Sequence, residues 1–183
     1  MNNSLIVKIS EGLGNQLFMY AHAYSLSRKL NKRLLIDNSS GYYKTKNSLR
    51  SHQKYMLDFF EIPDDYAPDN LRYDSFYRNI HKKLLLFFDK FNIKKSFFFE
   101  NKKKINNNKV VLNYNLKNCN FNDTIYVDGN FENESYFSEY RNDLINILSP
   151  RKEFLVQSNE ISSKLEETNS ISIHIRTNRF SDQ

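Results

Sequence analysis

The sequence predicts an α/β fold built on a parallel sheet, because a strand, a helix and a second strand follow one another near the N-terminus. An apolar, β-branched run predicts a buried strand over 5–10, and apolar residues at helical spacing predict a helix over 15–31. The run 33–37 predicts a second strand, which ends on the carboxylate of Asp37. Since such a β-α-β unit closes as a right-handed crossover, its two strands run parallel.

Further elements are expected along the rest of the chain. They are a short helix or turn at 55–60, strands at 109–113 and 124–128, helices ending at 148 and spanning 151–169, and a last strand at 170–176. In that last strand polar residues alternate with isoleucines, so Ser172, His174 and Arg176 share one face.

The segment 81–99 alternates lysine pairs with runs of leucine and phenylalanine, and it has two interpretations. In the first, it is a basic amphipathic segment that touches an anionic membrane surface. In the second, it is a helix and a strand whose aromatic residues pack on the sheet while the lysines stay in solvent. We favour the second interpretation, because aromatic side chains are usually buried.

The composition is that of a globular protein. Of the 183 residues, 39% are hydrophobic and 15% aromatic, which excludes a disordered chain and suffices for one core and the start of a second domain. The formal net charge of +6 is compatible with RNA, a membrane surface or a phosphorylated substrate, and it selects none of them.

The expected compartment is the cytoplasm. Cys119 is the one cysteine of the chain and has no internal partner for a disulfide, which favours a reducing environment. The apolar run at 5–10 is too short for a signal peptide, and no stretch reaches the roughly 18 apolar residues of a membrane-spanning helix. We therefore expect at most peripheral contact with the inner face of the membrane.

A glycine turn, Gly12-Leu13-Gly14, joins the first strand to the first helix. Glycines there permit positive φ and a close approach of the backbone to a ligand, and the free N–H groups that begin the helix favour an anion. One interpretation is a dinucleotide site in which Asp37 holds a ribose. The third glycine of that fingerprint is missing, however, because Leu17 occupies its place.

The string Gly12-Leu13-Gly14-Asn15-Gln16, followed by an aromatic-rich helix, resembles the N-terminal signature of bacterial α-1,2-fucosyltransferases. That signature usually begins with two glycines, and Glu11 stands at the first of them. Met19 replaces a further family residue, a glutamine, within the helix.

Two later segments resemble the same family, in the family's order. One begins at Asp128-Gly129, where Asn130 replaces an aromatic residue and Glu132-Asn133 replaces a Gln-Ser pair. The other is His174-Ile175-Arg176, in which the histidine and the first arginine match. Beyond them Thr177 and Arg179 replace a second arginine and an aspartate of the motif. The resemblance covers almost the whole chain.

The resemblance implies a fold similar to the GT-B type, with two Rossmann-like domains. Residues 1–169 would form the N-terminal, acceptor-side domain, and residues 170–183 would begin the GDP-fucose-binding domain. The implied activity is transfer of fucose from GDP-fucose to the 2-hydroxyl of galactose in a surface glycan such as lipopolysaccharide, with inversion. Most of the donor domain is absent from this chain, so we expect the chain alone to be inactive or nearly so.

The chemistry of this reaction needs a cation and a base. Negative charge develops on the diphosphate leaving group, and the sequence has no Asp-x-Asp motif that would hold a metal there. We therefore expect no metal cofactor, with Arg176 binding the phosphate oxygens through its planar fork and His174 orienting it. The base that inversion requires is left open among carboxylates, of which Asp128 and Glu132 are better placed than Asp37 and Glu11.

The expected site can be stated as two sets of residues. The expected catalytic residues are Arg176, His174, Asp128 and Glu132, and the expected substrate-binding residues are Gly12, Gly14, Asn15, Gln16 and Arg176, with no metal ligand.

Two alternatives belong to other classes of protein. A catalytically inactive remnant, serving as a binding or scaffold fragment, would follow from the absent donor domain. An RNA-binding protein would need a clustered basic face with stacking aromatic residues, and only 81–104 offers one. We expect no nucleic-acid partner.

Overall fold

The computed structural model describes residues 3–43, 53–63, 65–100, 120–155, 159–171 and 173. The chain divides into two compact units, Met1–Ser149 and Pro150–Gln183, and the first unit holds the sheet. The second contains α4 (Lys152–Leu155) and α5 (Asn159–Glu166). The domain boundary that the resemblance places after residue 169 stays a prediction.

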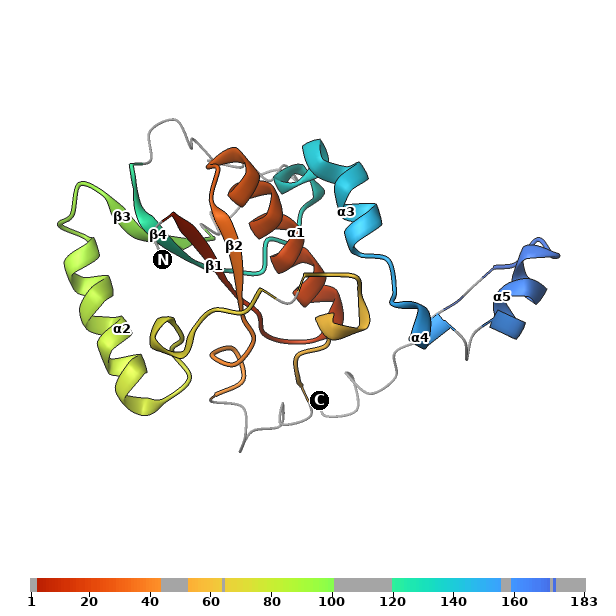
Figure 1. Ribbon diagram of the computed structural model, residues 1–183, viewed down its shortest axis with the longest axis horizontal. Helices are drawn as coiled ribbons and strands as arrows, with labels where there is room; N and C mark the ends of the chain where they lie inside the picture. The colour runs from red at the N-terminus through yellow and green to blue at the C-terminus, as the bar shows by residue number, and fades with distance from the viewer. Residues whose placement is uncertain are drawn as a thin grey trace, which may run out of the picture. The chain divides into compact units, whose positions relative to one another are not determined.

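Within the described residues four strands form one parallel sheet, in the order β2-β1-β4-β3 (Figure 1). The strands are β1 (Ser4–Lys8), β2 (Arg33–Asp37), β3 (Lys95–Phe99) and β4 (Phe121–Asp128). Between β1 and β2 the chain crosses over through α1 (Leu13–Lys29). The α/β fold with a Rossmann-like parallel sheet that the sequence predicts is therefore confirmed.

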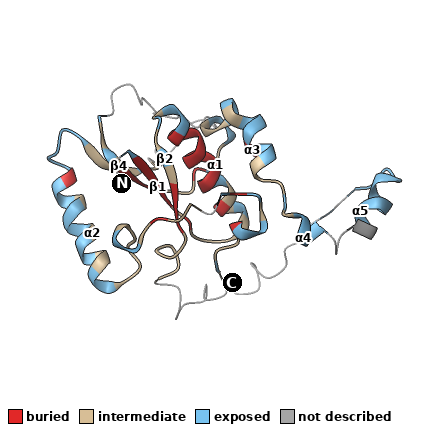
Figure 2. Cartoon of the chain, viewed as in Figure 1, coloured by how far each residue is buried: buried red, intermediate tan, exposed pale blue. Residues whose placement is uncertain are grey.

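Helices cover the two faces of the sheet. One face buries alternate residues of the strands, such as Val7 and Val127, against α1 and against α3 (Arg141–Ile147). The other face buries Ile6 and Tyr126 beneath a layer that includes Leu86 of α2 (Phe76–Asp89). Figure 2 shows the contrast between the buried strands and α1 and the exposed surface of α2.

Most of the expected elements of the first unit are present, with shifted ends. The strand at 33–37 is as predicted, the strand expected at 124–128 begins earlier, at Phe121, and the turn expected at 55–60 is a 3-10 helix, Leu57–Phe59. A second 3-10 helix, Asp69–Leu71, precedes α2. Before α3 the chain forms two more 3-10 turns, Glu134–Tyr136 and Ser138–Tyr140.

Other expectations fall on residues outside the described part or differ from it. The strand expected at 109–113 lies outside the described residues. Of the helix expected over 151–169, the structure describes two helical stretches, α4 and α5, and the residues between them lie outside the described part; the helical residues end at Glu166. Of the strand expected at 170–176, the structure describes 170, 171 and 173 and gives them no strand conformation.

The segment 81–99 forms a helix and a strand, α2 and β3, as expected. The accompanying expectation that its aromatic residues pack on the sheet is wrong for α2. Phe97 in β3 is buried, but Phe87 and Phe88 are more than half exposed, because Lys82 and Leu86 occupy the side of α2 that faces the sheet. Among the described residues no helix has the length and apolarity needed to cross a bilayer.

Candidate functional site

Charged residues form a row across the carboxyl edge of the sheet. Lys8 at the end of β1 pairs in register with Asp37 at the end of β2. On the other side of β1, Asp128 ends β4 and pairs with Phe99 of β3. Because ligands of parallel sheets bind beyond the carboxyl ends of the strands, this row marks the candidate site.

Asp128 is held between two lysines. Its Oδ1 lies 2.5 Å from Nζ of Lys8, and its Oδ2 lies 3.0 Å from Nζ of Lys82, which reaches it from α2. Burial alone would raise the pKa of the Asp128 carboxyl, but the two ammonium groups hold this pKa below its usual range. A carboxylate in this setting stays ionised and accepts a proton poorly.

Lys82 is also enclosed by aromatic rings. Its Nζ lies 5.2 Å from the ring centroid of Tyr73 and 4.7 Å from that of Tyr126, within the range of cation–π attraction. Its side chain is only 13% exposed. Lys82 therefore links α2 to the edge of the sheet. Its ammonium group is stabilised there by the Asp128 carboxylate and the two rings.

Asp37 closes the loop that follows β2. Its oxygens accept hydrogen bonds from the backbone N–H of Ser39 and Ser40, from the Ser40 hydroxyl at 2.5 Å and from the Tyr126 hydroxyl at 2.7 Å. Burial and the neighbouring Asp37 raise the pKa of Tyr126, so its hydroxyl remains a donor. Asp37 is fully buried, and both of its oxygens accept hydrogen bonds from the protein. The structure therefore assigns it a structural role instead of the ribose contact of a dinucleotide site.

The glycine turn differs from its expected conformation. The positive φ lies at Glu11, at 64°, and neither Gly12 nor Gly14 has a positive φ. A Cβ added at Gly12 or at Gly14 would have no atom within 4 Å, so both glycines border open space. The side chain of Asn15 donates a hydrogen bond to the Glu11 carboxylate and so ties the first turn of α1 back to the residue with the unusual φ.

Gln16 is buried and holds two segments together. Its Nε2 donates to the carbonyl of Glu11 at 2.9 Å and to that of Lys54 at 2.8 Å, and its Oε1 accepts from the backbone N–H of Met56 at 2.9 Å. With its amide fully engaged, Gln16 fixes the shape of the turn, while Asn15 and the glycines lie nearer the surface.

The loop after β4 is shaped by two residues. A Cβ at Gly129 would lie 2.5 Å from Cβ of Glu100, so only glycine fits there. Phe131 has a φ of 52° and is fully buried, with its ring stacked on that of His22 at 3.8 Å between centroids. The carboxylate of Glu132 that follows is exposed, and its Oε1 accepts from Asn130 at 3.3 Å.

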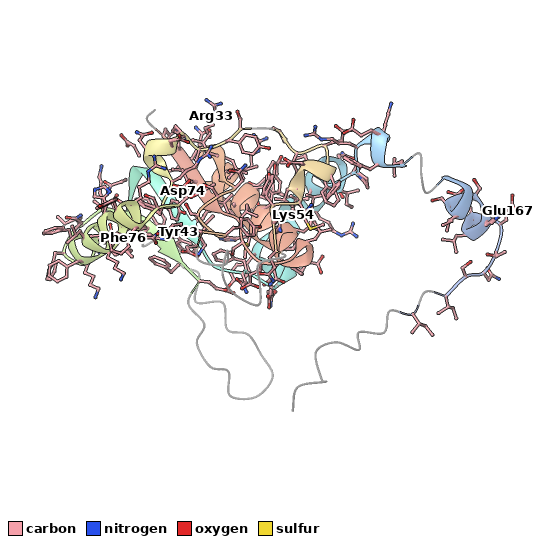
Figure 3. The ribbon with its side chains drawn as sticks, turned by 90° about the horizontal axis from the view of Figure 1, so that it is seen from below. Arg33, Tyr43, Lys54, Asp74, Phe76 and Glu167 are labelled. Atoms are coloured by element: carbon pink, nitrogen blue, oxygen red, sulfur yellow. The ribbon has the colours of Figure 1, made fainter. Side chains whose placement is uncertain are left out.

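Two cavities flank this edge. A polar cavity of about 220 Å³ is lined by Lys8, Ser40, Gly41, Tyr43, Tyr73, Asn79 and Lys82. An apolar cavity of about 510 Å³ lies between α1 and α3 and is lined by Gly14, Phe18, Ala21, Phe137, Arg141 and Leu144, among others. Tyr43, at the polar cavity, is labelled in Figure 3.

The structure brings most of the expected site residues to one edge of the sheet. After β1, Gly12 caps α1, and Gly14, Asn15 and Gln16 lie in the first turn of that helix. Asp128 ends the neighbouring strand β4, and Glu132 lies in the loop that follows it. His174 and Arg176 lie outside the described residues. Within the described part of the chain, no group of three or more His, Cys, Asp or Glu side chains could hold a metal ion.

Sequence reasoning missed three residues of this edge. Lys8 could have been found, because it ends an apolar strand at the same level as Asp37. Lys82 gives no such signal, since it is one of several lysines in its segment. Gly41 was also missed, although a Cβ there would lie 2.0 Å from the carbonyl oxygen of Ile9.

The chain is 27% identical over 173 residues to the α-1,2-colitosyltransferase of Escherichia coli, in a match that covers 94% of this chain. The match covers 53% of that relative, so the chain spans about half the length of the curated relative. No family model matches the chain, and no solved structure matches it significantly. At this identity the similarity suggests the family of sugar-transferring enzymes to which the motifs point.

Proposed function

We propose that this chain is the acceptor-side part of a glycosyltransferase that uses a nucleotide sugar as donor and a glycan as acceptor. The observation that carries the proposal is the meeting of two motif segments, Gly12–Gln16 and Asp128–Glu132, at the carboxyl ends of the adjacent strands β1 and β4. The similarity to a colitosyltransferase extends over both segments. The finer form of the proposal is transfer of fucose from GDP-fucose to the 2-hydroxyl of a galactose, with inversion.

An inverting transfer needs a base close to the acceptor hydroxyl. We assign this role to Glu132, because its carboxylate is exposed and has no lysine within ion-pair distance among the described contacts. Asp128 suits the role less well, since Lys8 and Lys82 occupy its two oxygens. In this proposal Asp128 positions the two lysines beside the polar cavity, where hydroxyl groups of the acceptor would bind.

The departing nucleoside diphosphate gains negative charge and needs a cation. We assign this role to Arg176, whose guanidinium can bind two phosphate oxygens at once, with His174 orienting it. No metal enters this scheme. The donor would approach over the glycine turn, where Gly12 and Gly14 leave open space beside the start of α1.

A second donor deserves equal testing, because the relative is named for colitosyl transfer. Both versions of the proposal share the α-1,2 linkage and the same edge of the sheet. They differ in the sugar that is transferred, so a direct comparison of the two donors separates them.

The test has a binding arm and a transfer arm. In the binding arm, ligand-observed NMR of the 183-residue chain compares methyl β-galactoside with its 2-deoxy analogue, and we expect weak binding that prefers the 2-hydroxyl. In the transfer arm, the chain and any longer product of its reading frame receive GDP-fucose or GDP-colitose with a galactose-terminated oligosaccharide. Mass spectrometry then detects the added sugar, and NMR assigns its linkage and anomeric configuration.

Each arm has an outcome that contradicts the proposal. A folded chain with no preference between the galactoside and its 2-deoxy analogue would exclude recognition of the 2-hydroxyl. A product linked elsewhere than at the 2-hydroxyl would exclude the α-1,2 assignment while leaving a glycosyltransferase. Glu132→Gln, with Glu134→Gln as its exposed neighbour and control, tests the base in the same assay.

A further inference from the structure

An exposed apolar ridge runs along α2 and just beyond its end. Its members are between 42% and 82% exposed, and they are Phe76, Tyr77, Ile80, Leu84, Phe87, Phe88 and Phe91. Their rings contact one another in solvent, with centroids 5.7 Å apart for Phe76 and Tyr77 and 5.5 Å apart for Phe87 and Phe91. A ridge of this size on a monomer marks an interaction surface.

The ridge lies on the side of α2 away from the sheet. At the helical repeat of about 100° per residue, its members fall within a sector of about 120°. Lys82 and Leu86, which contact the sheet layer, lie on the opposite side of the helix. Figure 3 shows α2, with Phe76 labelled near its start, and side chains that project from it into solvent. Among the described residues of the first unit, none covers the ridge, whose members stay at least 42% exposed.

Exposed cations border the ridge. On the helical wheel, Lys83 and Lys90 flank one edge of the ridge and His81 flanks the other edge. Lys94 lies beyond the end of the helix. The one acidic residue of α2, Asp89, is buried, and its carboxylate accepts a hydrogen bond from the backbone N–H of Ser96 at 2.7 Å. The exposed side of the helix is thus apolar and basic, with no acidic residue.

We propose that the α2 ridge binds the surface of an anionic phospholipid bilayer, with the helix lying in the plane of the interface. The apolar side chains would enter the boundary between headgroups and acyl chains, and the bordering lysines would meet lipid phosphates. The formal net charge of +6 adds attraction at longer range. This inference stands apart from the proposed sugar transfer, because it uses neither the glycine turn nor the charged row.

Charge complementarity favours a bilayer over a second copy of the chain. In a two-fold contact the ridge would face itself, and the basic border of one copy would meet the same basic border of the other. No acidic side chain on the described surface of α2 would compensate these cations. An anionic lipid surface supplies both an apolar layer and negative charge.

The first experiment places a fluorescent probe on the ridge. The sequence contains no tryptophan, so Phe87→Trp and, as control, Ile161→Trp each give a single reporter. Ile161 is 62% exposed and belongs to α5 of the other unit. With vesicles of phosphatidylcholine and phosphatidylglycerol, we expect a blue shift of emission at position 87, quenching there by brominated lipid, and no change at position 161.

The second experiment measures vesicle binding by flotation with two double variants, each with a matched control. Phe87→Ser with Phe91→Ser removes two ring contacts, and we expect a loss of about ten-fold or more in partitioning. Its control is Ile161→Ser with Leu165→Ser, two exposed apolar residues of α5. Lys83→Glu with Lys90→Glu should lower partitioning by about 25-fold or more, because each lysine near an anionic surface contributes about five-fold.

The charge control is Lys54→Glu with Lys152→Glu, two exposed lysines outside α2. Binding should fall with added salt and on vesicles of phosphatidylcholine alone. Failure of the folded chain to float with anionic vesicles at low salt would overturn the proposal. So would equal losses in the α2 variants and their controls. A concentration-dependent dimer that the Phe87→Ser, Phe91→Ser variant abolishes, without vesicle binding, would assign the ridge to a second copy instead.

Discussion

Lys82 on α2 and Asp128 at the end of β4 form an ion pair, with 3.0 Å between Nζ and Oδ2, although 46 residues separate them in the chain. Lys8 binds the other oxygen of the same carboxylate at 2.5 Å. The pair therefore joins the helix layer to the sheet at the edge where the candidate site lies. Removing the carboxylate would leave two partly buried ammonium groups facing each other.

We predict that Asp128→Asn lowers the free energy of unfolding by about 2–3 kcal/mol, less than the cost for a fully buried pair because these side chains keep some exposure. The wild-type pKa of Asp128 is depressed, so its contribution to stability is present above the unfolded pKa of about 4 and is lost as the pH falls through the folded pKa. Urea unfolding between pH 7 and pH 3 should show a smaller acid loss in the variant. Asp69→Asn, at an exposed ion pair, is the control, and an equal effect there would contradict the prediction.

His22 should make stability depend on pH in a different window. Burial, with a smaller contribution from Lys29, lowers its pKa to about 3, whereas the unfolded chain takes up the proton near pH 6.5. Between these values the unfolded state binds more protons, so stability falls as the pH falls, by up to about 1.4 kcal/mol per pH unit. We expect His22→Phe to flatten the slope of unfolding free energy between pH 6 and pH 4. An unaltered slope in His22→Phe would refute the assignment.

Two glycines of the site should respond in opposite ways to alanine. Gly41→Ala places a Cβ against the backbone of Ile9 and should cost about 2 kcal/mol or more. Gly14→Ala meets open space within α1 and should stabilise the protein by about 0.5 kcal/mol. Thermal unfolding of the two variants side by side is the measurement. A Gly41→Ala variant that is more stable than the wild type would contradict the prediction, because the segment around Gly41 could then move away from Ile9.

Gly14→Val should separate stability from activity. A Cβ at Gly14 has no atom within 4 Å, so the larger side chain starts in open space and the protein should stay folded. If the donor approaches there, as proposed, sugar transfer by a protein that includes the donor-binding part should be lost. The far-ultraviolet circular dichroism and the transfer rate are compared for Gly14→Val and Gly14→Ala. Normal turnover in Gly14→Val would place the turn outside the site.

Arg176 should contribute to donor binding without any metal. In a protein that includes the donor-binding part, Arg176→Ala should lower kcat/KM by on the order of 10²-fold or more, because a charged hydrogen bond to phosphate is lost. Arg176→Lys keeps the charge but loses the fork and should fall in between, and His174→Ala should cost less. Calorimetry with GDP should give the same order. Activity lost with EDTA and restored by Mn²⁺ or Mg²⁺ would assign the cation's role to a metal instead.

The sequence was most informative where local pattern decides structure. The strand 33–37 is bounded by a basic turn and by Asp37, and both ends were predicted as they are. The start of α1 was placed too late because the turn that precedes it uses a positive φ at Glu11, which no propensity assigns to glutamate.

Long-range contacts escaped the sequence for a physical reason. Helical spacing in 76–91 indicates an apolar stripe, but a stripe that faces a sheet and one that faces solvent have the same period. Long-range contacts, namely the ion pair of Lys82 with Asp128 and the packing of Leu86 on the sheet, determine which side of α2 turns inward. The hydrogen bonds of Gln16 to Lys54 and Met56 could not be predicted from the sequence either, because they depend on how the start of α1 meets a segment about 40 residues away.

The strand order has a consequence for how the protein is made. β1 lies inside the sheet, and its Val7 pairs with Val127, which leaves the ribosome 120 residues later. Until then, β1, α1 and β2 present an apolar strand edge with no neighbour, which invites pairing with other chains. Closing the sheet requires contacts of large sequence separation, and these form slowly. Newly synthesised chains therefore stay prone to aggregation until β4, the last of the described strands to be synthesised, has paired with β1.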